Sequence, residues 1–290
     1  MSNAPQNQRH ANLEPRHAKT PAQQDKGRKR SIVILSVILA LLLCGVAAGV
    51  GYMLWQQSEL NRVAEEMRNT PVPEPVDKPA EGPAEEAPAD DRVENPIDFA
   101  SLKLENPDIY AWIYVPGTDV NLPVLQSATN DFLYLDHNKD GEYAVEGAIY
   151  TEMANSTDFT DPVTLIYGHN LQNGTMFSTL HYFENEEFFA EHEDLLIYTP
   201  GHVLTYRIVS AYLYDDRHIL NSYDFSDPDV LQGYLDSVMN PDSLLVNVRS
   251  DTELSIDDRI VQLSTCMSDT SHTTSRYIVT GVLIDDQPTY

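Results

Sequence analysis

The sequence predicts a mainly β domain, a barrel or sandwich with a few peripheral helices, preceded by one transmembrane helix and a disordered spacer. Three observations lead to this fold class. Short apolar runs recur between residues 111 and 284, separated by turns such as Pro116-Gly117 and Pro200-Gly201. An uncharged apolar run precedes them at residues 32–54, and a Pro- and Glu-rich segment lies between the two regions.

Residues 31–55 are expected to form the transmembrane helix. About twenty apolar residues span a bilayer as a helix, and Tyr52 and Trp55 suit the far interface. A cleaved signal peptide is the alternative, but its apolar core is usually about 7–15 residues and is followed by a cleavage site of small residues. The run here is longer and lies well inside the chain, which favours an uncleaved anchor.

Residues 1–30 form a basic tail with no apolar periodicity, and we expect it to be disordered. They carry seven basic residues against Glu14 and Asp25, whereas the other 260 residues carry 11 basic and 43 acidic residues. Because basic residues stay on the cytoplasmic side, the tail is predicted inside the cell and residues 56–290 outside it. An outer part this acidic repels nucleic acid, and its simplest role is solubility.

Residues 56–94 are predicted to form a spacer outside the membrane. Leu60, Val63, Ala64 and Met67 follow a helical spacing, so the anchor helix is expected to continue briefly. Residues 70–91 are rich in Pro, Glu and Ala, and such a composition gives an extended linker with little apolar surface to bury. The globular domain therefore covers residues 95–290, which is long enough to bury a core.

Alternating apolar residues predict the elements of this domain. A helix is expected at 96–104, another within 178–192, and a third beginning at Asp227-Pro228, where a capping residue precedes proline. The turn at Pro200-Gly201 predicts a hairpin. Strands are expected at 111–115, 148–150, 163–167, 195–199, 203–214, 260–265 and 277–284.

Cys266 ends one of these strands, with Ile260 and Gln262 on one face and Val261 and Leu263 on the other. A thiol at a strand end is fixed by the sheet and still open to a cleft, as reactive groups often are. Cys44 lies in the predicted span, so the two cysteines cannot pair. Spacing alone leaves two interpretations open, an inert buried cysteine or a nucleophile that needs a nearby cation or histidine.

His169 and Arg276 are the candidate partners of this thiol. His169 follows the strand at 163–167 and Gly168, and a glycine there allows a sharp turn that places the imidazole at a rim. His272 competes, but it lies in a Ser- and Thr-rich loop. Arg276 opens the strand at 277–284, either as a strand-edge salt bridge or as an oxyanion donor. No cluster has metal-ligand spacing, and there is no glycine-rich phosphate loop.

Several motifs resemble those of one family. Leu263-Ser264-Thr265-Cys266, with an arginine opening the next strand, resembles the active-site motif of sortases. Tyr167-Gly168-His169-Asn170, with Gly174-Thr175-Met176-Phe177, resembles the class B pattern around the sortase histidine. The similarity extends in matching order over about residues 95–285, through the motifs at 106–113, 121–126, 134–137 and 147–150 and the helix after Asp227.

The resemblance implies an eight-stranded sortase barrel that performs transpeptidation without a cofactor or metal. Cys266 would attack a Thr–Gly or Thr–Asn bond in the sorting signal of an exported protein. His169 would protonate the leaving amine and deprotonate the incoming cell-wall (peptidoglycan precursor) or pilin amine. Arg276 would hold the substrate and stabilise the oxyanion, and Ser264 and Thr265 would line the cleft.

One departure and two alternatives accompany this prediction. The loop at 267–275 lacks the aromatic residue that many sortases place shortly after the cysteine, which affects recognition of the sorting signal rather than the chemistry. A cysteine L,D-transpeptidase is one alternative, but its His- and Gly-rich motif is absent. A catalytically inactive, membrane-anchored binding domain is the other, and it predicts an unreactive Cys266.

Overall fold

The computed structural model describes residues 21–72, 92–267 and 275–290 of the chain. The chain forms two compact units, residues 1–58 and residues 59–290, which are taken separately below. The predicted disorder of residues 1–20, most of the Pro-rich spacer at 70–91 and the competing His272 lie outside the described residues.

Helix α1 (Pro21–Asn69) begins in the first unit. Within its stretch Ile32–Glu65, an 18-residue window has a mean hydropathy of 2.9, so this stretch is long and apolar enough to cross a membrane. One expectation was wrong: residues 21–30, assigned to the disordered tail, are helical. Ala, Gln, Lys and Arg in this stretch are good helix formers, and Pro21 occupies the first helical position, where proline is tolerated. The helix continues past the apolar run, as the helical spacing after residue 59 predicted.

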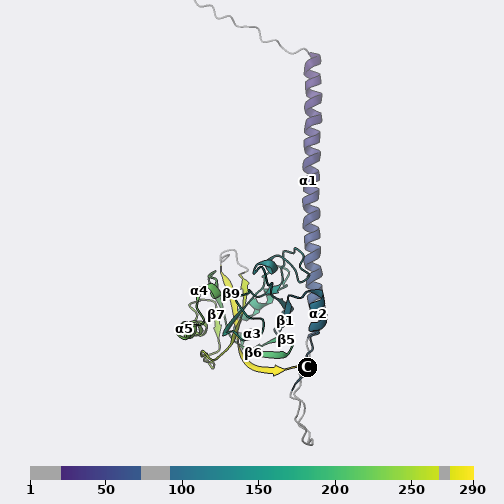
Figure 1. Cartoon of the computed structure of the whole chain (residues 1–290). Coiled ribbons are helices and arrows are strands. Elements are labelled where there is room, and N and C mark those ends of the chain that lie inside the picture. The colour runs from purple at the N-terminus through teal and green to yellow at the C-terminus, as the bar shows by residue number, and fades with distance from the viewer. Residues whose placement is uncertain (1–20, 73–91, 268–274) are drawn as a thin grey trace, which may run out of the picture. The chain divides into compact units, whose positions relative to one another are not determined.

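A closed β-barrel makes up most of the second unit (Figure 1). In the described part of that unit, eight strands follow one another around the barrel in the order β5-β1-β2-β3-β4-β8-β9-β6, and β6 pairs back with β5. A short ninth strand, β7, is added beside β6. The strands are β1 (Ile109–Tyr114), β2 (Asn121–Leu125), β3 (Ile149–Tyr150), β4 (Val163–Tyr167), β5 (Asp194–Thr199), β6 (His202–Tyr214), β7 (Val246–Val248), β8 (Ile260–Cys266) and β9 (Arg276–Pro288).

The expected strands are all present, and the β5–β6 hairpin turns at Pro200-Gly201 as predicted. The periodicity missed β2 and β7. Pro123 stands in the middle of β2 and weakens its strand pattern, and β7 has only three residues. The resemblance, by contrast, had covered the β2 segment.

Strand β8 is buried on both faces, which fixes the position of the cysteine at its end. Val261 and Leu263 point into the barrel interior, where they join the main apolar core. Ile260 points outward into a second core. Beside it, the Gln262 side-chain oxygen accepts a hydrogen bond of 2.6 Å from the Tyr234 hydroxyl. A strand with apolar or satisfied polar contacts on both sides is rigid, so its last residue is well placed.

Helices cover the outside of the barrel. Helix α5 (Pro228–Met239) carries Tyr234 and packs over β8, and it lies beside α4 (Ile219–Ser222) in Figure 1. The helix expected within 178–192 is divided into η2 (Ser178–Glu184) and α3 (Glu186–Glu191), because the Asn185 side chain caps a new helix by accepting from the Phe188 amide. The other helices are α2 (Phe99–Glu105) and η1 (Leu133–Leu135).

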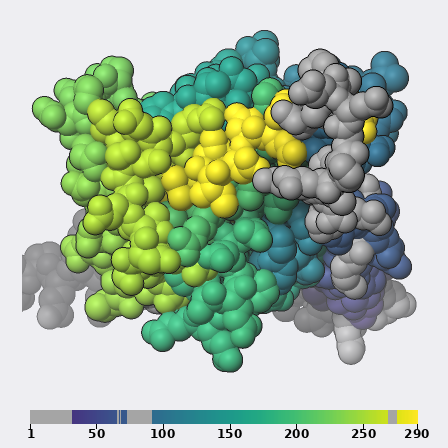
Figure 2. Space-filling view, turned by 90° about the horizontal axis from the view of Figure 1, so that it is seen from below, coloured from purple at the N-terminus to yellow at the C-terminus, as the bar shows by residue number. Residues whose placement is uncertain are grey.

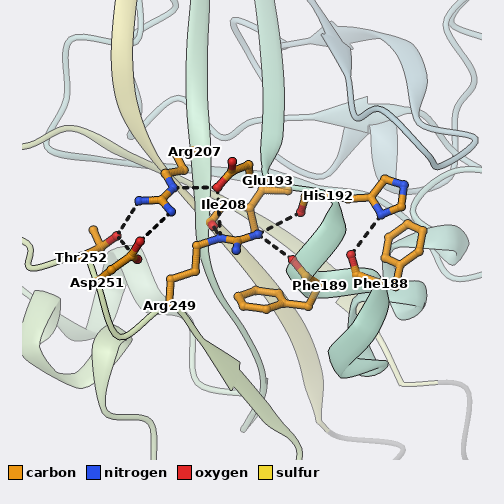
Figure 3. Close-up of polar contacts among 9 residues, drawn as sticks. All are labelled: Phe188, Phe189, His192, Glu193, Arg207, Ile208, Arg249, Asp251 and Thr252. Carbon is orange, nitrogen blue, oxygen red and sulfur yellow. Dashed lines mark hydrogen bonds and ion pairs between the residues drawn. The ribbon is translucent and has the colours of Figure 1, made fainter.

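Arg249, which follows β7, ties β6 to α3 (Figure 3). Its guanidinium donates to the carbonyl oxygens of Ile208 (2.7 Å), Phe189 (2.6 Å) and His192 (3.2 Å), and it stacks 4.7 Å from the Phe189 ring. Burial lowers the pKa of Arg249. The neighbouring Arg207 makes more exposed ion pairs, so the buried arginine is the stronger connection.

The strand ends divide the barrel into two rims. At one rim, β9 ends beside the start of β6, with Pro288 opposite His202. Figure 2, seen from below the view of Figure 1, shows this C-terminal part of β9 in yellow at the surface. At the other rim, β9 begins at Arg276, opposite both Tyr214 of β6 and Cys266 of β8. The candidate site residues gather at this second rim.

Candidate active site

Cys266, Ser264, Arg276 and Tyr167 share the outer face of three neighbouring strands. In the antiparallel β8–β9 pair Cys266 lies opposite Arg276, and in the parallel β4–β8 pair Tyr167 lies opposite Ser264. Side chains alternate along a strand, and paired residues project to the same side. The thiol and the guanidinium are therefore side by side, both partly buried.

Gly168 continues the β4–β8 pairing by one residue and faces the barrel interior. Its amide donates to the Ser264 carbonyl at 3.1 Å. A β-carbon on Gly168 would lie 2.6 Å from atoms of Ile149 and Phe177, so only glycine fits. The sequence suggested glycine for a sharp turn, whereas the structure requires it for close packing. His169 follows at the same rim, beyond the end of β4.

The imidazole of His169 is held by a loop from another part of the barrel. Its Nε2 lies 2.6 Å from the Leu135 carbonyl oxygen, at the end of η1. A carbonyl can only accept, so Nε2 carries the proton and donates it to this hydrogen bond. The other nitrogen, Nδ1, is then the one that can gain or lose a proton.

Two stacked tyrosines border the thiol and the arginine. The rings of Tyr150 (β3) and Tyr167 (β4) are 5.3 Å apart. Burial raises the pKa of both phenols, the Glu152 carboxylate raises it further, and the Arg276 guanidinium acts in the opposite direction. The Arg276 guanidinium is thus close enough to both rings to lower the pKa of their phenols. Its charge lies on the same face as Cys266.

Glu152 and His218 flank these tyrosines and were not selected from the sequence. The Glu152 carboxylate is buried and accepts from His218 Nε2 at 2.8 Å. His218 Nδ1 accepts from the Asn221 amide at the start of α4, which fixes this tautomer. The pair links α4 to β3 over 66 residues of sequence, a separation at which no local pattern could reveal it.

Ser264 and Thr265, both expected to line the cleft, lie on opposite faces of β8. Ser264 is on the cysteine face. Thr265 falls on the face of Val261 and Leu263 and is 1% exposed, so its side chain points into the barrel. Only the backbone of Thr265 remains available to a substrate on the outer face. The alternation of side chains along β8 was enough to predict that Thr265 faces the interior.

The backbone of Cys266 has partners that the sequence analysis did not identify. Its carbonyl oxygen accepts from the Asn170 side-chain amide at 2.9 Å and lies 3.0 Å from His181 Nε2. Asn170 follows the candidate histidine directly, whereas His181 comes from η2. Both residues act on the peptide that carries the thiol.

A groove with a volume of about 760 Å³ lies at the base of the β8–β9 connection. Met267, Ser275 and Tyr214 line it together with Leu245 and Arg217. Aromatic, apolar and charged groups thus lie next to the rim that carries Cys266. In the described part of the chain, no group of three or more His, Cys, Asp or Glu residues is arranged to hold a metal ion.

A closed barrel with a thiol, an imidazole and a guanidinium at one rim has the features of a cysteine-dependent acyl-transfer enzyme. The family model described as the sortase domain matches residues 113–284, and the chain belongs to the sortase family. Its relatives place it with the class B sortases, which makes it a sortase B-type cysteine transpeptidase.

Three relatives illustrate the similarity. The Sortase B of Listeria monocytogenes is 30% identical over 193 residues, covering 64% of this chain and 74% of that protein. The structure of Clostridium perfringens sortase B is 33% identical, with a TM-score of 0.58 over 64% of this chain and 99% of that one. A Staphylococcus aureus sortase B–substrate complex is 30% identical, with a TM-score of 0.57 over 64% and 84% of the two chains.

Proposed function

We propose that this protein is a membrane-anchored transpeptidase that cleaves a C-terminal sorting signal of exported proteins and joins them to a cell-wall or pilin amine. One observation carries the proposal: Cys266 lies opposite Arg276 on adjacent strands, and His169 follows the end of β4 that pairs with the cysteine strand. Sortase B has been solved with a substrate in the S. aureus protein and, in another structure, with triglycine, which supports a peptide donor and an amine acceptor.

In the first half-reaction, the Cys266 thiolate attacks the carbonyl carbon of the Thr–Gly or Thr–Asn bond. The carbonyl oxygen becomes an oxyanion, and the fixed positive charge of Arg276 is placed to stabilise it. The C–N bond then breaks. His169, anchored through Nε2, gives the proton on Nδ1 to the leaving amine, and a thioester remains on Cys266.

In the second half-reaction, the acceptor amine attacks the thioester. His169 Nδ1 takes the proton of the amine, the C–S bond breaks, and the thiolate of Cys266 is released. The new amide joins the exported protein to the acceptor, and protons and charge balance over the two steps. Ser264, on the same face as the thiol, and the backbone of Thr265 border the path of the substrate, which approaches at the Cys266 end of β8, beyond the part that α5 covers.

The apolar helix supports the proposal that the chain crosses the cell membrane once, with a different segment on each side. Residues 31–55 would span the cell membrane, with the basic tail 1–30 in the cytoplasm and 56–94 as a spacer outside. The catalytic domain 95–290 would then face both exported proteins and cell-wall precursors. This arrangement brings the enzyme to its two substrates on one side of the membrane.

Mass spectrometry of the full chain in detergent tests the mechanism. The probe is a set of peptides with a central Thr–Asn or Thr–Gly bond, offered with triglycine as acceptor. Wild type should form a thioacyl adduct, Cys266→Ala none, and His169→Ala should turn over at least about 100-fold more slowly. Cys44→Ala is the matched cysteine control and should behave as wild type.

The same peptides test the topology. Added to right-side-out membrane vesicles they should be cleaved, and added to sealed inside-out vesicles they should not. Equal cleavage in both preparations would contradict the orientation. Absence of any adduct, together with a Cys266 that resists iodoacetamide, would contradict the transpeptidase function of this site.

A further inference from the structure

The parallel pairing of β4 with β8 stops one residue short of the cysteine. The Gly168 amide donates to the Ser264 carbonyl, and in a continuing parallel ladder the amide of residue 170 would donate to the Cys266 carbonyl. Instead the chain turns away after Gly168, and the Asn170 side-chain amide donates to that carbonyl at 2.9 Å. A side chain thus takes the place of the missing backbone donor.

His181 is the second group at this carbonyl. It lies on η2, 85 residues from Cys266 in sequence, and its Nε2 is 3.0 Å from the Cys266 oxygen and 2.9 Å from the Asn170 amide nitrogen. Its ring stacks on Tyr277 of β9 with centroids 4.9 Å apart. Only 13% of its side chain is exposed, so the ring has a fixed place between η2 and the end of the barrel.

Glu184 holds the other side of the same imidazole. Its Oε1 lies 2.5 Å from His181 Nδ1, one turn further along η2. The ring is therefore held on both sides, by the Glu184 carboxylate at Nδ1 and by the Asn170 amide and the Cys266 carbonyl at Nε2. The other titratable group against the ring is the Tyr277 phenol, whose pKa burial raises, so that it stays neutral.

We propose that Asn170, His181 and Glu184 form a positioning unit that holds the peptide of Cys266, with Glu184 fixing the ring of His181. The inference rests on the proposed role of Cys266 as the nucleophile. Asn170 and His181 contact the backbone carbonyl of Cys266, whereas the thiol of the same residue projects from the outer face towards the substrate. It is separate from His169, which handles the proton of the amine.

The expected consequence is on turnover rather than on substrate binding. Cys266 is the last residue of β8, and the connection to β9 begins immediately after it. Without the two side-chain contacts, this peptide would keep only the 3.4 Å hydrogen bond from the Met267 amide to the Ser275 carbonyl. A small displacement of a nucleophile reduces the rate by up to about 100-fold, whereas the other residues along the substrate path stay in place.

Two variants of His181, measured in the full chain in detergent, distinguish the effect of its hydrogen bond from the effect of its ring. With the Thr–Asn peptide and triglycine, His181→Leu should lower kcat at least about tenfold and leave KM within about twofold. His181→Gln retains a side-chain N–H for the carbonyl and should recover most of kcat. His202→Gln is the matched control, since His202 also pairs with a carboxylate (Asp286, 2.7 Å) but lies at the opposite rim.

The outcomes separate this inference from the proposed function. If wild type turns over and folded His181→Leu matches it in kcat, the positioning unit is refuted while the transpeptidase stands. A rise in KM with unchanged kcat also contradicts the unit, because it would assign His181 to substrate binding. If wild type itself forms no thioacyl adduct, the proposed function has failed and not the contacts of His181.

A measurement that keeps His181 covers the case in which His181→Leu does not fold. In the full chain labelled with ¹⁵N-histidine, Glu184→Gln should shift the Nδ1 signal of His181, and Asn170→Ala should shift its Nε2 signal. Unchanged signals in both variants would overturn the proposal, since the ring would then contact neither group.

Discussion

At the scale of single residues, the geometry of the site depends on the space available to each side chain. Gly168 is needed because Ile149 and Phe177 occupy the space of a β-carbon, and this close contact sets the level at which His169 leaves the sheet. The Leu135 carbonyl then orients the imidazole. The geometry of the proposed site is therefore determined by packing inside the barrel as much as by the proposed catalytic groups.

Substitution of Gly168 by alanine tests this dependence. The new methyl group would lie 2.6 Å from the Phe177 ring carbon Cγ, which cannot swing aside as a chain end can. The free energy of unfolding, measured in urea, should fall by about 1–3 kcal/mol, and turnover should fall with it because His169 is displaced. Gly233→Ala is the matched control, since nothing lies within 4 Å of that position in α5.

For Gly233→Ala we expect no loss of stability, and a gain of up to about 1 kcal/mol from helix propensity. Equal stability of Gly168→Ala and wild type would show that the contact with Phe177 relaxes freely. The packing argument for this glycine would then be wrong.

At the scale of elements, helices and short loops hold the strand ends in register. α5 covers the outer face of β8 through Tyr234 and Gln262, and α3 is bound to β6 through Arg249. Each connection satisfies backbone or side-chain groups that would otherwise be buried without partners. The strands around the site are thus held from outside as well as by their ladders.

Arg249→Leu should destabilise the protein much more than Arg207→Leu. The first change leaves the carbonyl oxygens of Ile208, Phe189 and His192 without their donor, at a cost of about 3 kcal/mol or more. The second removes ion pairs to Glu193 and Asp251 whose partners are about half exposed or more, which are worth less than about 1 kcal/mol. Urea unfolding of both variants gives the comparison, and equal losses would contradict it.

At the scale of the whole molecule, the barrel buries many phenols. Burial raises the pKa of Tyr134 and of Tyr198 to about 12, and it raises that of Tyr206 and Tyr212 further. In the unfolded chain a tyrosine ionises near pH 10. The folded state therefore binds these protons more tightly than the unfolded state does.

The sign of the pH dependence follows from linkage. The contribution of the buried tyrosines to stability is complete below about pH 10 and is lost as the pH rises from about 10 to 12, where only the unfolded chain releases the protons. Urea midpoints should fall over this interval, and tyrosinate absorbance from the core should appear with unfolding. Ionisation of these phenols near pH 10 in a folded protein would contradict the prediction.

The local patterns of the chain were enough for much of the fold. Alternation predicted β4, β5, β6 and β8 to within one residue at each end, and β9 except for its last four residues, because the side chains of a strand repeat every two residues whatever lies across the barrel. The motif resemblance also supplied Cys266, His169 and Arg276, and the structure brings these three to one rim. Their roles remain predictions until the variants are measured.

By itself, then, the sequence determined most of the strands, the apolar helix and the family, since each of these is written in consecutive residues. Only the tertiary structure decided that Leu135 holds His169 and that His181 reaches the Cys266 carbonyl. These contacts join residues 34 and 85 positions apart, and they exist because the barrel closes. Closure is a property of all eight strands together, so no single segment of the chain could reveal it.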